Sequence, residues 1–161
     1  MKKIKLPQGK FALVDDGDFE YLNKFKWRAI KNNLTFYVQR NIRLVNGKWT
    51  SIYMHRVLLN VPEEMETDHI DHCGLNNQRA NLRICTHQKN MMNRNSNKNG
   101  SSEFKGVSWY KRDRKWHAQI RYKKKNYHLG YFILENNAAL AYNKKAKELF
   151  GEFARLNKII K

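Results

Sequence analysis

The chain has 161 residues and a mass of 19.3 kDa, which allows one ordinary domain or two small domains with thin cores. It carries 32 lysines and arginines against 14 acidic residues, and the resulting formal charge of +18 predicts a polyanionic partner such as a nucleic acid. The sequence has no apolar run long enough for a membrane span, no secretory signal and only two cysteines, so we expect a cytoplasmic, intracellular protein with no membrane partner.

The first 67 residues consist of short strand-like runs separated by turn signals. The acidic stretch Asp15–Asp18 lacks the glutamate of a calcium loop and is interpreted as a turn. Asn46-Gly47 predicts a hairpin between the runs that flank it. The predicted strands cover residues 10–14, 26–30, 35–40, 42–45 and 48–54, and a short helix is predicted at 55–59.

The segment 68–90 holds the residue types that phosphodiester hydrolysis requires. We expect a strand that carries Asp68 and His69, then a broad loop, a second strand over 81–85 and a helix that opens after Thr86. A histidine has the pKa of a general base near neutral pH, which makes His69 the candidate base. A divalent cation prefers hard oxygen ligands, and Asp68 and the carbonyl of Asn90 would supply them.

The spacing within this segment is specific, because Asn81 follows His69 by twelve residues and Asn90 follows Asn81 by nine. With Asp68 directly before His69, the pattern resembles the HNH motif on a ββα-metal finger, and residues 50–95 are similar to phage and intron-encoded HNH homing endonucleases. The resemblance implies that His69 is the general base and that Asp68 and Asn90 ligate a single Mg²⁺ or Mn²⁺. It also implies that Asn81 fixes the loop and orients the base, and that the host cell is that of a phage or mobile element.

A structural zinc ion is the alternative use of the cysteines and histidines near this motif. The sequence has no CxxC pair, and its two cysteines lie on opposite sides of the loop, so we expect no zinc. His87 follows Asn81 by six residues, not nine, and does not fit the third position of the motif. The roles of these residues stay open: His72, Cys73, Cys85 and His87.

The second half begins after a polar, basic stretch, 93–103, which we interpret as a flexible linker. Three strand-like runs at 105–110, 115–121 and 126–132 precede a helical stripe over 135–150, with Gly151 as its C-cap. Alternation along the middle run places its apolar residues against the helix and its polar residues on the outer face. The large aromatic residues Trp109, Trp116, Tyr142 and Phe150 are expected in the core.

Residues 102–157 resemble the ethylene-response-factor, or Apetala-type, DNA-binding domain. The motifs that carry this resemblance cover residues 104–107, 115–121, 129–132, 138–142 and 150–157. It implies a three-stranded antiparallel sheet on one helix, with the outer face of the sheet in the major groove of DNA. Arg121 keeps the family residue, whereas other groove positions differ, so the sequence preference of the plant domains is not carried over: Gln119, Ser108, Asn126 and His128.

Contacts with double-stranded DNA are therefore predicted along this sheet and its turns. His55 and Arg56 are candidates for phosphate contacts beside the nuclease motif. The candidates in the second half are Lys105, Ser108, Tyr110, Arg112, Arg114, Lys115, His117, Gln119, Arg121, Lys123, Asn126 and His128.

The sequence thus predicts an α+β protein with a β-rich region and HNH nuclease motif in 1–92, a linker in 93–103 and a sheet-plus-helix DNA-binding domain in 104–157. The predicted function is site-specific, metal-dependent DNA cleavage of the homing type, which leaves a 5′-phosphate and a 3′-hydroxyl. The alternative is a non-catalytic DNA-binding regulator with a relic nuclease segment; an RNA-binding protein is the third hypothesis. The target sequence, nicking versus double-strand cleavage and the oligomeric state stay open.

Overall fold

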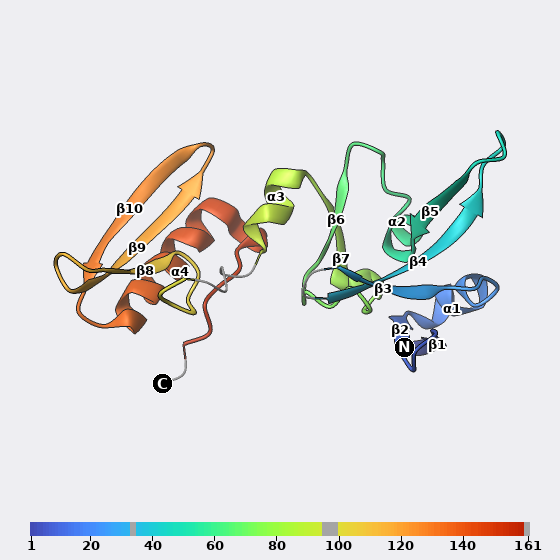
Figure 1. The fold of residues 1–161 in the computed structure, drawn as a ribbon, viewed down its shortest axis with the longest axis horizontal. Helices are drawn as coiled ribbons and strands as arrows, with labels where there is room; N and C mark the ends of the chain where they lie inside the picture. The colour runs from blue at the N-terminus through green and yellow to red at the C-terminus, as the bar shows by residue number, and fades with distance from the viewer. Residues whose placement is uncertain (33–34, 95–99, 160–161) are drawn as a thin grey trace. The chain divides into compact units, whose positions relative to one another are not determined.

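A computed structural model describes residues 1–32, 35–94 and 100–159 of the protein (Figure 1). The chain forms two compact units, unit 1 over residues 1–87 and unit 2 over residues 88–161. The described residues form four antiparallel sheets and four α-helices, which confirms the predicted α+β class. None of the described helices is long and apolar enough to cross a bilayer.

Unit 1 is built from short antiparallel sheets, much as the turn signals predict. β1 (Lys2–Lys5) pairs with β2 (Phe11–Val14), and β4 (Thr35–Arg43) lies between β3 (Arg28–Asn32) and β5 (Trp49–Tyr53). The predicted hairpin joins β4 to β5, and Gly47 takes the positive φ of +79° that its turn requires. α2 (Met54–Leu59) follows β5 directly.

The predicted turn at Asp15–Asp18 is wrong, because α1 (Asp16–Leu22) starts within it. Asp15 has the extended backbone of an N-cap residue, and Asp16 and Asp18 lie in the first turn, where negative charge is favourable. Leu22 is fully buried at the end of this helix and joins the core of unit 1. The acidic residues therefore do not form a turn; they start a short helix.

One apolar cluster holds the elements of unit 1 together. Its members come from the N-terminal hairpin, α1, the three-stranded sheet, α2 and the strand that follows the nuclease loop, so each element contributes to one shared core. The buried residues are Ile4, Leu6, Ala12, Val14, Leu22, Trp27, Ala29, Val38, Met54, Leu58 and Leu82.

The predicted nuclease segment folds as a hairpin followed by a helix. β6 (Glu66–His69) pairs antiparallel with β7 (Leu82–Cys85), and a single 3₁₀ turn, η1 (Arg79–Asn81), leads into β7. α3 (His87–Met92) comes next in the chain, and the boundary between the two units falls within it, after His87. The order strand, loop, strand, helix is the predicted one, and the arrangement of these elements around a metal stays a prediction.

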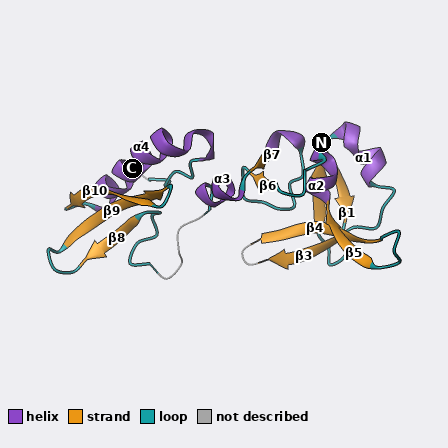
Figure 2. Ribbon diagram, turned by 90° about the horizontal axis from the view of Figure 1, so that it is seen from above, coloured by secondary structure: helices purple, strands orange, loops and turns teal. Residues whose placement is uncertain are grey.

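Unit 2 has the predicted sheet-and-helix architecture. β9 (Lys115–Tyr122) lies between β8 (Val107–Tyr110) and β10 (Lys125–Phe132), and all three strands are antiparallel. α4 (Glu135–Phe150) packs on one face of this sheet (Figure 2). A 3₁₀ turn, η2 (Gly151–Phe153), follows, and Gly151 is the C-cap with φ +55°.

The core of unit 2 lies between α4 and the inner face of the sheet. Small side chains, Ala118 on β9 and Ala138 on α4, are fully buried there, which allows the helix to approach the sheet closely. Tyr142 and Phe150 are buried as predicted, whereas Trp109 on the edge strand β8 is 38% exposed, which corrects its placement in the core.

The predicted linker lies partly outside the described residues, which omit 95–99. Its described ends are packed, since Asn93 and Ser102 are both buried. The hydroxyl of Ser102 donates a hydrogen bond of 2.6 Å to the carboxylate of Glu135 at the start of α4. Residues 100–102 therefore belong structurally to unit 2.

Gly106 is a position where any side chain conflicts with the packing of unit 2. Its φ is +75°, and an added Cβ would lie 2.6 Å from the carbonyl oxygen of Gln119 and against the ring of Tyr142. We expect Gly106→Ala to destabilise unit 2 by about 2 to 4 kcal/mol. Hydrogen exchange of the β9 and α4 amides checks this, with Gly17→Ala as the matched control, because Gly17 lies in α1 with open space around it. Unchanged protection in unit 2 would contradict the prediction.

Candidate functional site

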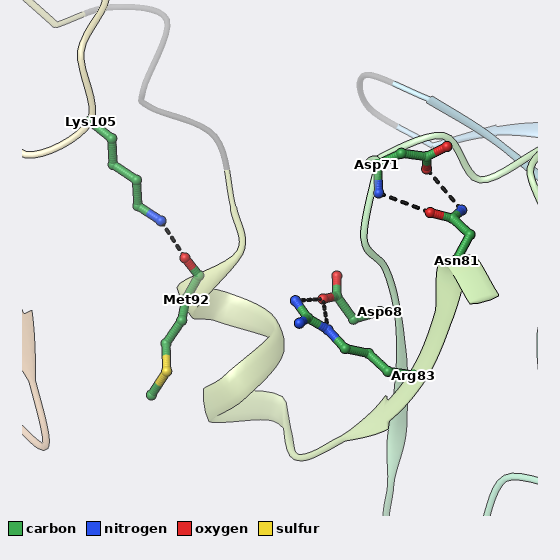
Figure 3. A network of polar contacts seen from close by, with 6 residues as sticks. All are labelled: Asp68, Asp71, Asn81, Arg83, Met92 and Lys105. Carbon is green, nitrogen blue, oxygen red and sulfur yellow. Dashed lines mark hydrogen bonds and ion pairs between the residues drawn. The ribbon is translucent and has the colours of Figure 1, made fainter. Parts of the chain in front are cut away.

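The β6–β7 hairpin positions the two residues of the Asp-His pair. Asp68 and His69 are consecutive on β6 and are each only 5% exposed. Asp68 lies opposite Arg83 in the register of the two strands. The Nε and Nη2 atoms of Arg83 donate to the same oxygen, Oδ2 of Asp68, at 2.9 and 2.6 Å (Figure 3). A partly buried guanidinium thus compensates the charge of the buried carboxylate and fixes its orientation.

His69 lies in a cluster of rings with Tyr37, Tyr53 and His55, and two of these rings contact it directly. Its ring centroid lies 5.6 Å from that of Tyr37 and 5.1 Å from that of His55, both in edge-to-face geometry. Burial lowers the pKa of His69 below 6.5, although the charges of Asp71 and Asp68 and a hydrogen bond to Asn77 oppose the shift. The imidazole is therefore neutral at neutral pH, which is the state that a general base requires.

His55 supports His69 from α2. Its ring stacks on Tyr53, with centroids 5.3 Å apart and planes 12° apart, and it meets the ring of His69 at 90°. Burial, together with the electrostatic effects of His69 and Arg56, lowers the pKa of His55 to about 3. His55 is thus a neutral, buried ring that packs directly against the candidate base.

Arg56, the other residue predicted beside the motif, is engaged with the backbone. Its guanidinium donates to the carbonyl oxygens of Met65 at 2.8 Å, Val61 at 3.2 Å and Pro62 at 2.7 Å. These bonds attach the end of α2 to the segment that leads into β6. A phosphate contact by Arg56 stays a prediction.

Asn81 closes the loop between β6 and β7. Its Oδ1 accepts from the backbone N–H of Asp71 at 3.0 Å, and its Nδ2 donates to Oδ1 of Asp71 and to the carbonyl of Asn76, both at 2.9 Å (Figure 3). Its own carbonyl accepts from the N–H of Ile70 at 2.9 Å. One side chain therefore ties the residues directly after His69 to the start of β7.

Two aspartates, Asp18 of α1 and its N-cap Asp15, bind the end of the same loop, a contact that the sequence analysis missed. Asp15 accepts from Nε2 of Gln78 at 3.2 Å and from the backbone N–H of Arg79 at 2.8 Å. Asp18 receives two bonds of 2.8 Å from the guanidinium of Arg79. More than sixty residues separate these partners in the chain, so no local pattern signals the contact.

Asn90, the third residue of the predicted motif, lies in α3 and in unit 2, whereas Asp68 and His69 lie in unit 1. The pairing of Asp68 with Asn90 around a metal ion stays a prediction. Cys73 is exposed, Cys85 is buried, and no disulfide joins them. Among the described residues, no group of three or more histidine, cysteine and acidic side chains is placed to hold a metal ion.

The structure brings most of the predicted DNA-contacting strand residues of unit 2 onto one face, called here the outer face. It is the face of the β8–β10 sheet opposite α4. The strand register pairs Ser108 with His117, His128 with Gln119, and Asn126 with Arg121. Tyr110 pairs with Lys115 at one end of this face, and the other candidates, Arg112, Arg114 and Lys123, are exposed in the turns.

Lys105 differs from the other candidates in unit 2 because it is used within the fold. Its Nζ donates to the carbonyl oxygen of Met92 at 2.6 Å (Figure 3). The side chain of Asn157 bonds both its backbone N–H and its carbonyl. Burial, with the charges of Arg155 and Arg94, lowers the pKa of Lys105 to about 8. Its contact with DNA stays a prediction.

A β-bulge adds Tyr131 to the outer face, a residue that the sequence pattern missed. The register of β10 against β9 shifts between His128 and Gly130, so Tyr131 lies opposite His117. Strict alternation would place Gly130 there instead. The φ of Gly130 is +122°, a backbone conformation that favours glycine, and the glycine is the one local signal of the bulge.

The geometry defines a class of protein first: a small α+β protein with a buried aspartate–histidine pair on a β-hairpin. The chain is 31% identical over 158 residues to an uncharacterized HNH endonuclease of Acanthamoeba polyphaga mimivirus, an alignment that covers 94% of this chain and 77% of the relative. The chain belongs to the HNH endonuclease family. It is also 32% identical over 95 residues to Protein 3.8 of Escherichia phage T7, across 59% of this chain and 78% of that protein. No family profile and no solved structure matches the chain.

Removal of the Asn81 side chain should loosen the nuclease loop. Asn81→Ala loses three hydrogen bonds to Asp71 and Asn76, and we expect a loss of about 2 to 3 kcal/mol in the free energy of unfolding. Urea denaturation measures the change. Asn46→Ala is the matched control, since Asn46 makes a single exposed bond in the β4–β5 turn. Equal effects of the two variants would show that Asn81 does not hold the loop.

Proposed function

We propose that the protein is a metal-dependent, site-specific DNA endonuclease of the homing type. Family membership supports a nuclease, and the observation that carries the proposal is the buried Asp68–His69 pair on β6. The hydrolysis of one phosphodiester bond would leave a 5′-phosphate and a 3′-hydroxyl. The substrate is double-stranded DNA, in keeping with the charge of +18.

In this proposal His69 removes the proton from the attacking water. Its lowered pKa keeps the imidazole neutral and able to accept that proton. The rings of Tyr37 and His55 restrict the rotation of His69, so the accepting nitrogen is presented in one orientation. Asn81 acts on the base indirectly, by fixing the loop that continues from it.

Asp68 and Asn90 would hold the metal ion. A carboxylate and an amide carbonyl are hard oxygen donors, which suits Mg²⁺ or Mn²⁺. The ion would neutralise charge on the phosphate and on the leaving oxygen. Nε and Nη2 of Arg83 both donate to one oxygen of Asp68, which sets the direction in which the carboxylate faces.

Unit 2 would supply most of the affinity and the register on DNA. Residues 105–161 carry a net charge of +11, and the polar side chains of the strands lie on the outer face. Lysines and arginines in the turns suit phosphates, whereas Gln119, Arg121 and Asn126 have the donors and acceptors that read base edges. The similarity to ethylene-response-factor domains supports this use of the sheet.

The direct test is the relaxation of supercoiled plasmid in Mg²⁺. We expect the wild type to cut and His69→Ala to retain DNA binding while cleavage falls by a factor of about 10² to 10⁴, because the general base is lost. His87→Gln, a change of an exposed histidine that pairs with Glu66, should cut as the wild type does. If the wild type shows no Mg²⁺-dependent cleavage on any substrate, including its native locus, the alternative of a DNA-binding regulator with a relic nuclease segment holds.

The pH dependence of cleavage reports on the same histidine. Because the pKa of His69 is lowered, the neutral base persists to pH values below 6.5, and the fall of kcat/KM on the acid side should begin below that value. A pH profile of single-turnover cleavage measures the midpoint, with DNA binding recorded at each pH as the control. An acid limb centred above 6.5 would contradict a buried His69 as the base.

A further inference from the structure

The centre of the outer face of unit 2 is a cluster of four rings from all three strands. His117 lies 4.6 Å from His128 and 5.0 Å from Tyr131, measured between ring centroids, and Tyr110 lies 5.0 Å from Tyr131. The two histidines are also joined directly, since Nε2 of His117 lies 2.6 Å from Nδ1 of His128. This separation is that of a short hydrogen bond.

The rings of this cluster are tilted against one another, by 30° between His117 and His128 and by 56° between His128 and Tyr131. The two histidines meet through ring nitrogen atoms, which lie at the edges of the rings. Polar contacts with the edges of paired bases are therefore the use that this pair favours.

The hydrogen bond between the histidines restricts what their other nitrogens do. A neutral imidazole has one N–H donor and one acceptor nitrogen. If His117 donates through Nε2, its Nδ1 is an acceptor and Nε2 of His128 is a donor; if His128 donates through Nδ1, both roles are exchanged. In either tautomer the neutral pair offers one donor and one acceptor to a ligand.

A single added proton changes this pattern without breaking the bond. One ring becomes an imidazolium that donates to the other, and the neutral ring then carries its own hydrogen on the remaining nitrogen. Both remaining nitrogens, Nδ1 of His117 and Nε2 of His128, are now donors, and the pair carries one positive charge. A second proton would place two donors against each other at 2.6 Å, which disfavours it.

We propose that His117 and His128 act as one proton-coupled unit that reads base edges of duplex DNA. This inference rests on the proposed use of the outer face for DNA binding. When neutral, the unit matches a base edge that presents one acceptor and one amino donor. Because the pair has two tautomers, the acceptor can face either histidine. When protonated, it matches acceptors only, namely the keto and ring-nitrogen atoms of guanine, O4 of thymine or phosphate oxygens, and it rejects the amino groups of adenine and cytosine.

Within the described parts of the chain, no carboxylate is hydrogen-bonded or ion-paired to either histidine. β8 contributes Ser108 opposite His117, β10 contributes Tyr131, and α4 packs on the other face of the sheet. On β9 the cations Lys115 and Arg121 share the outer face with His117. Arg112, in the β8–β9 turn, is paired with Asp113 and lies over the ring of Tyr110.

Burial and charge act on His117 in the same direction. Burial and the neighbouring His128 lower the pKa of His117 from 6.5, so His117 is neutral near pH 7 in the absence of DNA. A phosphate backbone beside the pair would favour the charged form, and protonation would then accompany binding as the pH falls.

The test compares the duplex sequences that the full chain selects from a random library at about pH 8 and about pH 5.5, in EDTA so that no cleavage occurs. We expect keto groups to replace amino groups at one or two positions in the acid selection. We also expect binding to these duplexes to be about fivefold tighter in acid, through one added cation. The double variant His117→Asn/His128→Asn, which has no imidazole at the pair, should select the same sequences at both pH values, whereas His87→Gln, a change in unit 1, should keep the wild-type response.

A second measurement needs no DNA and keeps the inference testable if the variant folds poorly. The ¹⁵N chemical shifts of the imidazoles in the wild type should show one proton taken up jointly by His117 and His128. Independent titration of the two rings would overturn the inference, and so would identical base preferences at both pH values in a protein that binds DNA. A chain that selects no duplex at either pH would instead refute the proposed DNA binding by the outer face.

Discussion

The hydrogen bonds of Asn81 across the loop between β6 and β7 are the constraint on which the candidate active site depends. The two strands have four residues each, and an isolated two-stranded sheet of that size is marginal in water. Asn81 bonds the backbone and the carboxylate of Asp71 and the carbonyl of Asn76, so it joins the loop at its base. Asp15 and Asp18 bind the end of the same loop.

Burial has opposite consequences for the two side chains on the two faces of β6. Consecutive residues of a strand point to opposite sides, so Asp68 meets Arg83 while His69 meets the rings of Tyr37 and His55. Burial stabilises the neutral form of a histidine, which suits a base, but it destabilises a charged carboxylate. Arg83 compensates that effect at Asp68 alone, because its guanidinium lies on the carboxylate side of the strand. The same strand thus carries a neutral imidazole on one face and a carboxylate paired with arginine on the other.

Local patterns predicted the hairpins, the order of elements around the motif and the outer face of unit 2, because each depends on residues close in sequence. The contacts of Asp15 and Asp18 with Arg79 were beyond such patterns, since distant segments make them, and the acidic cluster was misread as a turn. Tyr131 was missed for another reason. A bulge changes the side to which every later residue of a strand points, and a period of two contains no sign of it except the glycine.

Affinity for any DNA and discrimination between DNA sequences depend on different side chains of unit 2. Each lysine or arginine on a phosphate strengthens binding to every DNA sequence alike, and a charge of +18 makes such binding strong. Discrimination therefore has to come from groups whose contacts depend on the base. At the centre of the outer face, the groups of this kind are the amide of Gln119 and the imidazoles of His117 and His128, which lie among the cations of the turns. An uncharged polar side chain adds affinity only where the base edge offers matching hydrogen-bond partners. An unmatched polar group that is desolvated in the groove weakens binding. In the proposed site-specific enzyme, these amide and imidazole groups would supply the discrimination together with Arg121 of the same strand face.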